Sequence, residues 1–397
     1  MSAPEVPAPP PWGVVRVLSV TQTLAWASLY YAIAVLAPAI EADTGWRRDW
    51  VMGGFTLALF VQGAAALPAG LAIDRFGGRV VMTAGSVLGA LALAALAASP
   101  GLGLFWLAWA LAGAAMAATL YEPAFATITA TFGPLSRRAI TIVTLAGGLA
   151  STLSFPVSLW LLQRFGWRAT FAAWAVLQLL ACLPLHWFGL PSIRGGRAAR
   201  RPVHLRGVLR APAYWFATAA LALGGLVTTA IGVHSIPILQ EKGFGAEGAV
   251  ALASLIGPMQ VAGRVLEFGP LGRLRPTWVA VVCAGAVPAS LLCLLAAGGS
   301  WWIATAFVVL YGAANGVMTI VRGALPADLF GREGYGGIAG AMATPAMFAR
   351  AIAPFAAGVG WTVFGGYGPV LLGLIAIGLG SLVAFVLAAR TAPARAG

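Results

Sequence analysis

Twelve apolar runs, each about as long as a membrane-spanning helix, constrain what this chain can fold into. Of its 397 residues, 60% are hydrophobic and only 9% are charged, whereas soluble domains carry about 25% charged residues. A helix needs about 20 apolar residues to cross a bilayer. The runs fall near 15–40, 51–72, 80–98, 103–125, 139–162 and 168–190, and again near 213–238, 248–268, 277–297, 301–325, 337–363 and 368–389. We therefore expect an all-α membrane protein with twelve transmembrane helices.

A long polar stretch divides these runs into two sets of six. Residues 191–210 carry six arginines and no acidic residue. The sequence therefore predicts an N-terminal six-helix bundle over 1–190, a basic cytoplasmic linker over 191–212 and a C-terminal six-helix bundle over 213–397.

The two sets also resemble each other in sequence. Three short patterns recur at matching places: Phe132-Gly133 with Phe330-Gly331, Pro156 with Pro354, and Gly70-x-x-x-Asp74 with Gly263-x-x-x-Glu267. Such echoes favour two six-helix pseudo-repeats.

The net charge of +13 would suggest a nucleic-acid partner in a soluble protein. Here the arginines stand singly or in pairs between apolar runs, so we expect the lipid bilayer, and no nucleic acid, as the surrounding partner. With the N-terminus in the cytoplasm, sixteen Lys and Arg residues fall on that side and five on the other. Cytoplasmic loops carry the excess of positive charge. This distribution predicts an integral protein of the cytoplasmic (inner) membrane with both termini in the cytoplasm.

The stretch G-L-A-I-D-R-F-G-G-R, over 70–79, links the second and third runs. It resembles the cytoplasmic loop between helices two and three of the major facilitator superfamily, G-x-L-x-D-R-x-G-R. Gly70, Asp74, Arg75 and Gly77 fall in place, whereas Ala72 replaces the family's Leu and the last Arg is displaced to Arg79.

This resemblance implies a secondary transporter that works by alternating access, with helices one, four, seven and ten around a central cavity. It also implies that Asp74 belongs to a charge and helix-dipole latch against the other half, which favours the outward-open state. Positive charge on a cytoplasmic loop is the simpler explanation of the arginines, but it does not explain Asp74.

Ionisable side chains inside a bilayer are costly and are functional candidates by default. Those inside the predicted spans are Glu122, His234, Arg264, Glu267, Arg322 and Arg350. Burial of a carboxyl group favours its protonated form, so Glu122 is a candidate for proton coupling; an ion pair with Arg322 is the structural alternative. His234 could equally be a hydrogen-bonded structural residue. The choice between packing and cavity charge stays open for Arg350.

Arg264 and Glu267 are three residues apart and share a helix face. A self-neutralising pair and a substrate or proton role are both open for them. The stretches H-S-I-P-I-L-Q-E-K-G (234–243) and G-P-M-Q-V-A-G-R (257–264) are similar to the monocarboxylate and oxalate/formate-type branch of the superfamily. In that branch an Arg of helix eight engages the carboxylate substrate, which implies this role for Arg264. The planar guanidinium suits a carboxylate because it donates two parallel hydrogen bonds.

Two polar stripes should face protein or a water-filled cavity and not lipid. The stripe on the tenth span is Tyr311, Asn315, Thr319 and Arg322, and that on the first span is Ser19, Gln22, Thr23, Trp26 and Tyr30. The resemblance places both at the substrate cavity, although an aromatic residue such as Trp26 often serves packing.

These observations predict a monomeric carrier that moves a small solute, an organic anion such as a carboxylate, coupled to protons. The alternative within transport is drug or cation efflux by proton antiport. The stretch A-G-G-L-A-S-T-L-S-F-P (146–156) disfavours it, because it departs from the G-x-x-x-G-P-x-x-G-G pattern of drug/proton antiporters. A non-transporting membrane sensor is a further alternative. We expect no enzymatic activity and no cofactor, and no His, Cys, Asp or Glu cluster has metal-ligand spacing.

Overall fold

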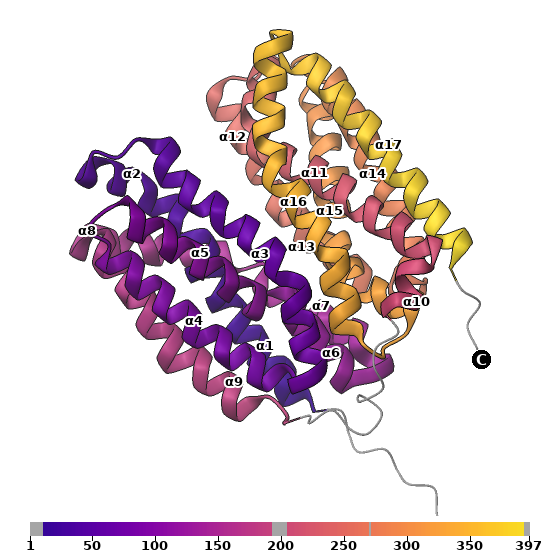
Figure 1. Ribbon diagram of the computed structural model, residues 1–397. Coiled ribbons are helices and arrows are strands. Elements are labelled where there is room, and N and C mark those ends of the chain that lie inside the picture. The colour runs from indigo at the N-terminus through magenta and orange to yellow at the C-terminus, as the bar shows by residue number, and fades with distance from the viewer. Residues whose placement is uncertain (1–10, 193–204, 270, 393–397) are drawn as a thin grey trace, which may run out of the picture.

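The computed structural model describes residues 11–192, 205–269 and 271–392, and within these ranges every regular element is a helix (Figure 1). In these three ranges, ten stretches are long and apolar enough to cross a membrane. One of them, Leu102–Gly189, has 88 residues, several times the length of one crossing. It is broken after α6 and again at Gly166, so it supplies three of the predicted spans. The prediction of twelve membrane-spanning helices is confirmed.

The N-terminal half consists of the first six spans. Its helices are α1 (Trp12–Ala25), η1 (Trp26–Tyr31), α2 (Ala32–Thr44), α3 (Arg48–Phe76), α4 (Gly78–Ala98), α5 (Leu102–Thr119), α6 (Tyr121–Phe132), η2 (Gly133–Leu135), α7 (Ser136–Gly147), α8 (Ala150–Leu177), η3 (Gln178–Cys182) and α9 (Leu183–Gly189).

The C-terminal half consists of the last six. Its helices are α10 (Leu205–Arg210), α11 (Pro212–Glu241), α12 (Ala246–Ser254), α13 (Ile256–Phe268), η4 (Leu271–Arg273), α14 (Pro276–Ala296), α15 (Trp301–Phe330), α16 (Tyr335–Phe364) and α17 (Tyr367–Thr391). Most of the predicted linker, 193–204, lies outside the described residues, and α10 forms in the part that follows.

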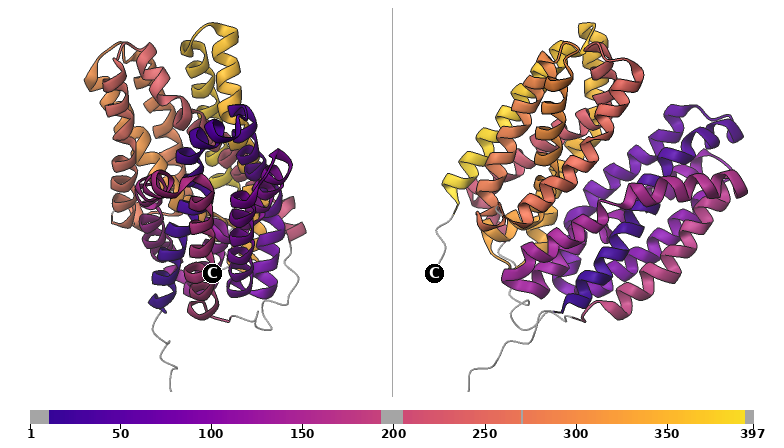
Figure 2. Two further views of the ribbon diagram at one scale, coloured as in Figure 1. Left: turned by 90° about the vertical axis from the view of Figure 1, so that its left-hand side faces the viewer. Right: turned by 180° about the vertical axis from the view of Figure 1, so that it is seen from behind.

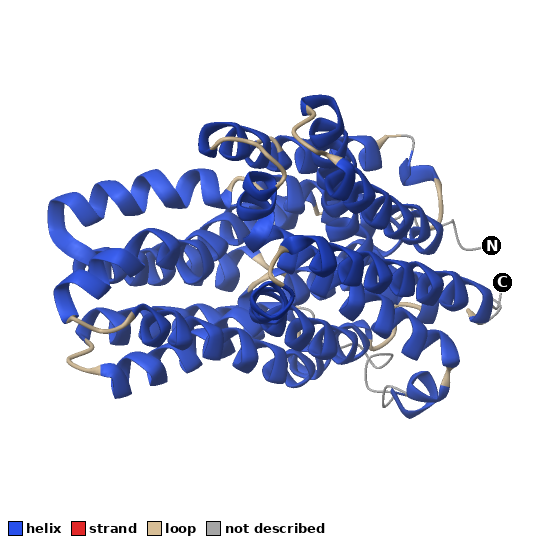
Figure 3. Cartoon of the chain, turned by 90° about the horizontal axis from the view of Figure 1, so that it is seen from above, coloured by secondary structure: helices blue, strands red, loops and turns tan. Residues whose placement is uncertain are grey.

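The two halves are joined at one end and diverge toward the other (Figures 1 and 2). We call the joined end, where α1 begins and α17 ends, the basal end, and the opposite end the distal end. The contacts between α3 and α16 join residues 60–74 to residues 336–348, from the rings of Phe60 and Phe348 to Gly70 and Gly336. The view from above shows most of the described helices from the side, running across the picture and joined by loops (Figure 3).

Each half has its own apolar core, and a third cluster lies between them at the basal end. The third cluster brings Ile320, Tyr335 and Ala339 of the C-terminal half against Phe125 and Ile73 of the N-terminal half. Burial of apolar surface in this cluster therefore favours the closed basal end.

The fourth span is broken at Leu120, between α5 and α6, where ψ is −152°. Pro123 lies four residues after Thr119 and has no N–H with which to bond its carbonyl. The Nε2 group of Gln22 donates to that carbonyl instead, at 2.5 Å. The break exposes a new helix N-terminus in the middle of the bundle and places Glu122 in its first turn.

Candidate functional site

Asp74 joins the end of α3 to the beginning of α16 in the other half. Its Oδ1 accepts from the backbone N–H of Gly336 at 2.9 Å, and its Oδ2 from that of Gly337 at 2.7 Å. A carboxylate at a helix N-terminus meets unpaired N–H donors and the positive end of the helix dipole. The backbones are close here, because a Cβ atom on Gly70 would lie 2.0 Å from the carbonyl oxygen of Gly336.

The other residues of this loop act within their own half. Gly77 has φ +81°, a conformation that glycine adopts without steric cost, and it ends α3 directly before α4 begins. Arg75 is exposed beside the ring of Phe76. The guanidinium of Arg79 lies over Trp187, 4.5 Å from the ring centroid, so it packs inside the N-terminal half.

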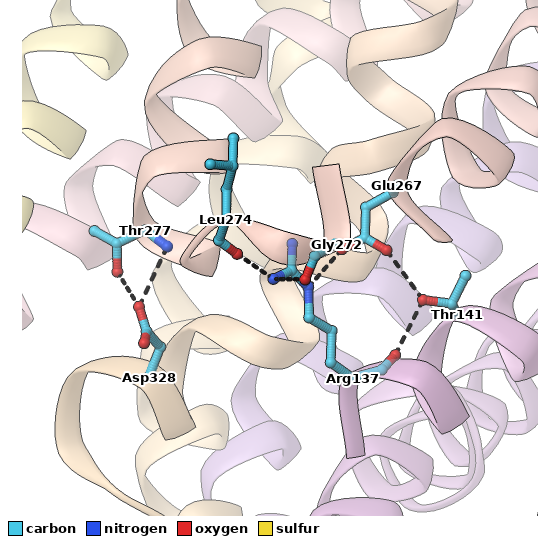
Figure 4. A network of polar contacts seen from close by, with 7 residues as sticks. All are labelled: Arg137, Thr141, Glu267, Gly272, Leu274, Thr277 and Asp328. Carbon is cyan, nitrogen blue, oxygen red and sulfur yellow. Dashed lines mark hydrogen bonds and ion pairs between the residues drawn. The ribbon is translucent and has the colours of Figure 1, made fainter. Parts of the chain in front are cut away.

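Glu267 forms a second contact between the halves at the basal end (Figure 4). Its Oε1 accepts from Nε of Arg137 at 2.5 Å, and its Oε2 from the hydroxyl of Thr141 at 3.2 Å. Arg137 also donates to the carbonyls of Gly272 and Leu274. Only 1% of the Glu267 side chain and 17% of that of Arg137 are exposed, so water screens this pair weakly.

Arg264 has a partner other than Glu267. Its Nη1 donates to the carbonyl of Thr144 in the N-terminal half at 2.7 Å, while Glu267 bonds Arg137. The Arg264 side chain is 5% exposed, and its Nε is buried with no hydrogen-bond partner in the described part of the chain. Arg264 thus retains a donor where the two halves meet.

Glu122 and Arg322 face each other across the two halves. The distance from Arg322 Nη2 to Glu122 Oε1 is 3.4 Å, and both side chains are about one-sixth exposed, at 17% and 15%. Both line a cavity of about 20 Å³ together with Phe125, Tyr335 and Met342. The structural ion pair that the sequence left open is therefore present.

The polar stripe of the tenth span divides between two environments. Asn315, Thr319 and Arg322 line a cavity of about 50 Å³ in the C-terminal half. Tyr311 is 1% exposed, and its hydroxyl donates to the carbonyl of Thr228 at 2.7 Å, so it packs inside that half.

The aromatic residues of the first span pack against Tyr121, the residue before Glu122. The ring of Trp26 lies 5.0 Å from that of Tyr30 and 5.0 Å from that of Tyr121, and Tyr31 lies 6.1 Å away. The charges of Arg264, Arg322 and Glu122 interact with Tyr121. Gln22, by contrast, is fully buried at the α5–α6 break.

His234 connects three helices of the C-terminal half. Its Nδ1 lies 2.7 Å from the hydroxyl of Tyr367, and its Nε2 lies 3.0 Å from the carbonyl oxygen of Pro354. Both ring nitrogens are therefore engaged, as in a structural histidine.

Three arginines of the C-terminal half, Arg264, Arg322 and Arg350, are buried or half-buried. Arg350 on α16 lines the same cavity as Arg322, Arg322 lies 3.4 Å from Glu122, and Arg264 contacts the Thr144 carbonyl of α7. Within residues 11–192, 205–269 and 271–392, no group of three or more His, Cys, Asp or Glu side chains could hold a metal ion.

The sequence did not predict the residues that Glu267 contacts. Arg137 counted only as loop charge, and Thr141 was not singled out. The internal repeat held the missing signal: Glu267 matches Asp74, and the helix after Phe132-Gly133 matches the helix after Phe330-Gly331. Together these matches place Glu267 against α7, as Asp74 lies against α16.

Comparison with known proteins agrees with this fold. Human monocarboxylate transporter 11 is 30% identical over 324 residues, which cover 75% of this chain and 63% of that protein. This chain therefore spans less than two-thirds of that relative's length.

Two solved structures share the fold, with sequence identities too low to show more than the fold. The human organic anion transporter MFSD10 (TETRAN) superposes with a TM-score of 0.75 at 16% identity, over 95% of this chain and 100% of the other. The proton:xylose symporter XylE superposes with a TM-score of 0.77 at 13% identity, over 96% of each chain.

The family model described as the Major Facilitator Superfamily matches residues 18–354. The match includes the second-to-third helix loop with Asp74, the broken fourth span with Glu122, and the pair of helices that carry Arg264 and Arg322. The chain belongs to the Major Facilitator Superfamily of membrane transporters.

Proposed function

We propose that this transporter moves a small organic anion, such as a monocarboxylate, together with protons by alternating access. It acts as a monomer in the cytoplasmic membrane with both termini in the cytoplasm, as the distribution of arginines favours. The observation that carries the proposal is an excess of arginine over acid: Glu122 pairs with Arg322 at 3.4 Å, Arg350 lines a cavity together with Arg322, and Arg264 is buried against the Thr144 carbonyl of the other half.

An excess of guanidinium groups favours an anionic solute. Isolated charge is costly in a low-dielectric interior, so a carboxylate that enters the centre offsets the unpaired positive charge. The buried Nε of Arg264 has no acceptor in the described part of the chain, and it can donate to a carboxylate oxygen in a charge-assisted hydrogen bond. The name of the human relative, a monocarboxylate transporter, supports the same class of solute.

The Glu122–Arg322 pair offers a route for proton coupling. A substrate carboxylate and Glu122 compete for the same guanidinium, because the pair is separated by only 3.4 Å. When the substrate displaces Glu122, protonation removes the repulsion between the two carboxylates. Substrate and proton then bind together, as coupled transport requires.

The contacts at the basal end define the state of the transporter. Asp74 and Glu267 both join the halves at that end, while the helices diverge distally (Figure 2). We assign this arrangement to the outward-facing state, with Asp74 as part of the latch. Conversion to the inward-facing state breaks both contacts.

Efflux of a lipophilic cation is the second candidate, and the aromatic cluster favours it. The rings of Tyr30 and Tyr121 lie 5.0 Å from that of Trp26 and the ring of Tyr31 lies 6.1 Å from it, and aromatic faces attract cations. Glu122 would then bind the cation or the proton.

Uptake into proteoliposomes under an imposed pH gradient separates the two candidates. We expect gradient-dependent uptake of a labelled monocarboxylate by the intact protein, loss of that uptake in Arg264→Ala, and normal uptake in Arg390→Ala, which removes an exposed arginine at the end of α17. Movement of a lipophilic cation that requires Glu122 but not Arg264 would establish efflux instead.

A further inference from the structure

The C-terminal half contains a second cavity, enclosed by its own helices. We call it the C-half cavity; its volume is about 50 Å³, and its lining residues come from α11, α14, α15, α16 and α17. Small residues create the space, among them Gly224, Gly225, Ala284, Ala314 and Gly378. The wall is largely apolar, with Val287 and Phe385 among the larger side chains.

Two arginines and an asparagine bring hydrogen-bond donors to this apolar space. Arg322, Arg350 and Asn315 all line the C-half cavity. Nε of Arg350 lies 2.9 Å from the place that a Cβ atom on Gly225 would occupy, so the guanidinium reaches α11 across the bundle. The Nε atoms of both arginines are buried and have no hydrogen-bond partner within the described ranges.

The two arginines of the C-half cavity carry more positive charge than the nearby carboxylate of Glu122 can neutralise. Arg322 contacts Glu122 through Nη2, and it lines the C-half cavity as well as the interface cavity. No salt bridge to Arg350 is present among the described residues. A buried guanidinium without an acceptor or a counter-charge is costly. Water can accept its hydrogen bonds but cannot neutralise it.

We propose that the C-half cavity binds a small monovalent anion between Arg322 and Arg350, with Asn315 as a further donor. A volume of about 50 Å³ holds a single ion or a carboxylate head group and excludes large anions. The anion comes from free chloride or from the carboxylate of the transported solute. Chloride binding does not depend on the proposed function, whereas occupation by the solute's own carboxylate rests on it.

Thermal unfolding of the purified protein in detergent, followed by tryptophan fluorescence, tests this site. Sodium gluconate is replaced stepwise by sodium chloride or sodium acetate at constant ionic strength. We expect a saturable rise in the unfolding midpoint on the order of a few degrees with the small anion. Gluconate is too large for the cavity and serves as the reference anion.

Variants assign the effect to the C-half cavity. Arg350→Gln removes the unpaired guanidinium, and Ala314→Leu fills the space while it keeps both arginines. The anion-dependent shift should vanish in both, whatever their own midpoints are. Arg390→Gln removes an exposed arginine of the same half and should keep the shift. Equal midpoints in gluconate, chloride and acetate for the intact protein, or an undiminished shift in Arg350→Gln, would overturn the proposal.

The two sources of the anion give different results. If chloride raises the unfolding midpoint and acetate raises it no further than chloride does, the anion is the free ion. If acetate alone raises the midpoint, the anion is the solute's carboxylate. Both results support the site. Liposome uptake is read separately, so absence of the anion shift in an intact protein that still takes up carboxylate overturns this inference alone. A chloride shift without any carboxylate uptake overturns the proposed function alone.

Discussion

Arg137 of the N-terminal half and Glu267 of the C-terminal half form an ion pair of 2.5 Å at the basal end (Figure 4). The contact of Asp74 in the N-terminal half with Gly336 in the C-terminal half is its counterpart, with the roles of the two halves exchanged. In each case the acidic residue lies four residues after a glycine, at the end of the second span of one half. It contacts the second residue of the helix that begins the fifth span of the other half. The pseudo-repeat thus supplies two related contacts that hold the basal end closed.

The Arg137–Glu267 pair should respond unequally to loss of its two members. Arg137→Ala leaves Glu267, which is 1% exposed, as a buried charge that keeps only the Thr141 hydroxyl. Breaking a buried pair in this way costs about 3–5 kcal/mol. In Glu267→Ala, the more exposed Arg137 can reach water and keeps two carbonyl acceptors. We expect Arg137→Ala to lower the thermal unfolding midpoint further than Glu267→Ala.

The double variant checks that this difference comes from the pair itself. Arg137→Ala with Glu267→Ala removes both charges and should recover part of the loss seen in Arg137→Ala. Strictly additive midpoints in the double-mutant cycle would show that the two side chains do not interact.

Gly70→Ala should disrupt the closed basal end. The added Cβ atom would lie 2.0 Å from the carbonyl oxygen of Gly336, and two backbones cannot yield as a flexible side chain does. We expect a loss of about 1–3 kcal/mol for such overpacking and a longer distance between spin labels placed on the basal ends of the two halves. Gly257→Ala is the matched control, because its Cβ atom would meet nothing within 4 Å. An unchanged distance in Gly70→Ala would contradict the expectation.

Apolar length predicted the helices of this protein well, because bilayer thickness fixes the number of residues per span. It could not predict the break at Leu120, where the Thr119 carbonyl accepts a hydrogen bond from Gln22, 97 residues before Thr119 in the chain. The sequence brought out Glu122, Arg264 and Arg322 through the cost of buried charge. Arg264 contacts Thr144 and Glu267 contacts Arg137. Both partners lie in the other half, so these contacts depend on how the two bundles dock.

Asp74→Ala should shift the equilibrium toward the inward-facing state. The variant removes two hydrogen bonds to the N-terminus of α16, and hydrogen bonds to charged groups contribute about 1.5–3 kcal/mol each to stability. A loss at the low end of that range already changes the ratio of two states by about tenfold. Spin-label distances across the basal end measure the populations, and Asp74→Asn, which keeps one acceptor oxygen, should fall between the intact protein and Asp74→Ala. A distance distribution like that of the intact protein would refute the latch.

His234→Ala should affect stability more than transport. The imidazole joins α11 to Tyr367 on α17 and to Pro354 on α16, and its loss leaves the Pro354 carbonyl without that contact. Such a loss costs about 1–3 kcal/mol. We expect a lower unfolding midpoint with an unchanged KM for the substrate, whereas a large rise in KM at an unchanged midpoint would place His234 in the binding site.

Glu122 and Arg322 should separate proton coupling from substrate binding. Glu122→Gln keeps the size of the side chain but carries no charge, so it leaves Arg322 free for the substrate carboxylate at every pH. We expect exchange of carboxylate across equilibrated proteoliposomes to persist in this variant, while an imposed pH gradient no longer accelerates uptake. Arg322→Gln removes the shared guanidinium and should weaken carboxylate binding by about 10–100-fold, the effect of losing about 1.4–2.8 kcal/mol. Gradient-driven uptake that survives Glu122→Gln would exclude Glu122 as the coupling carboxylate, because that variant has no group at this position that can bind and release a proton.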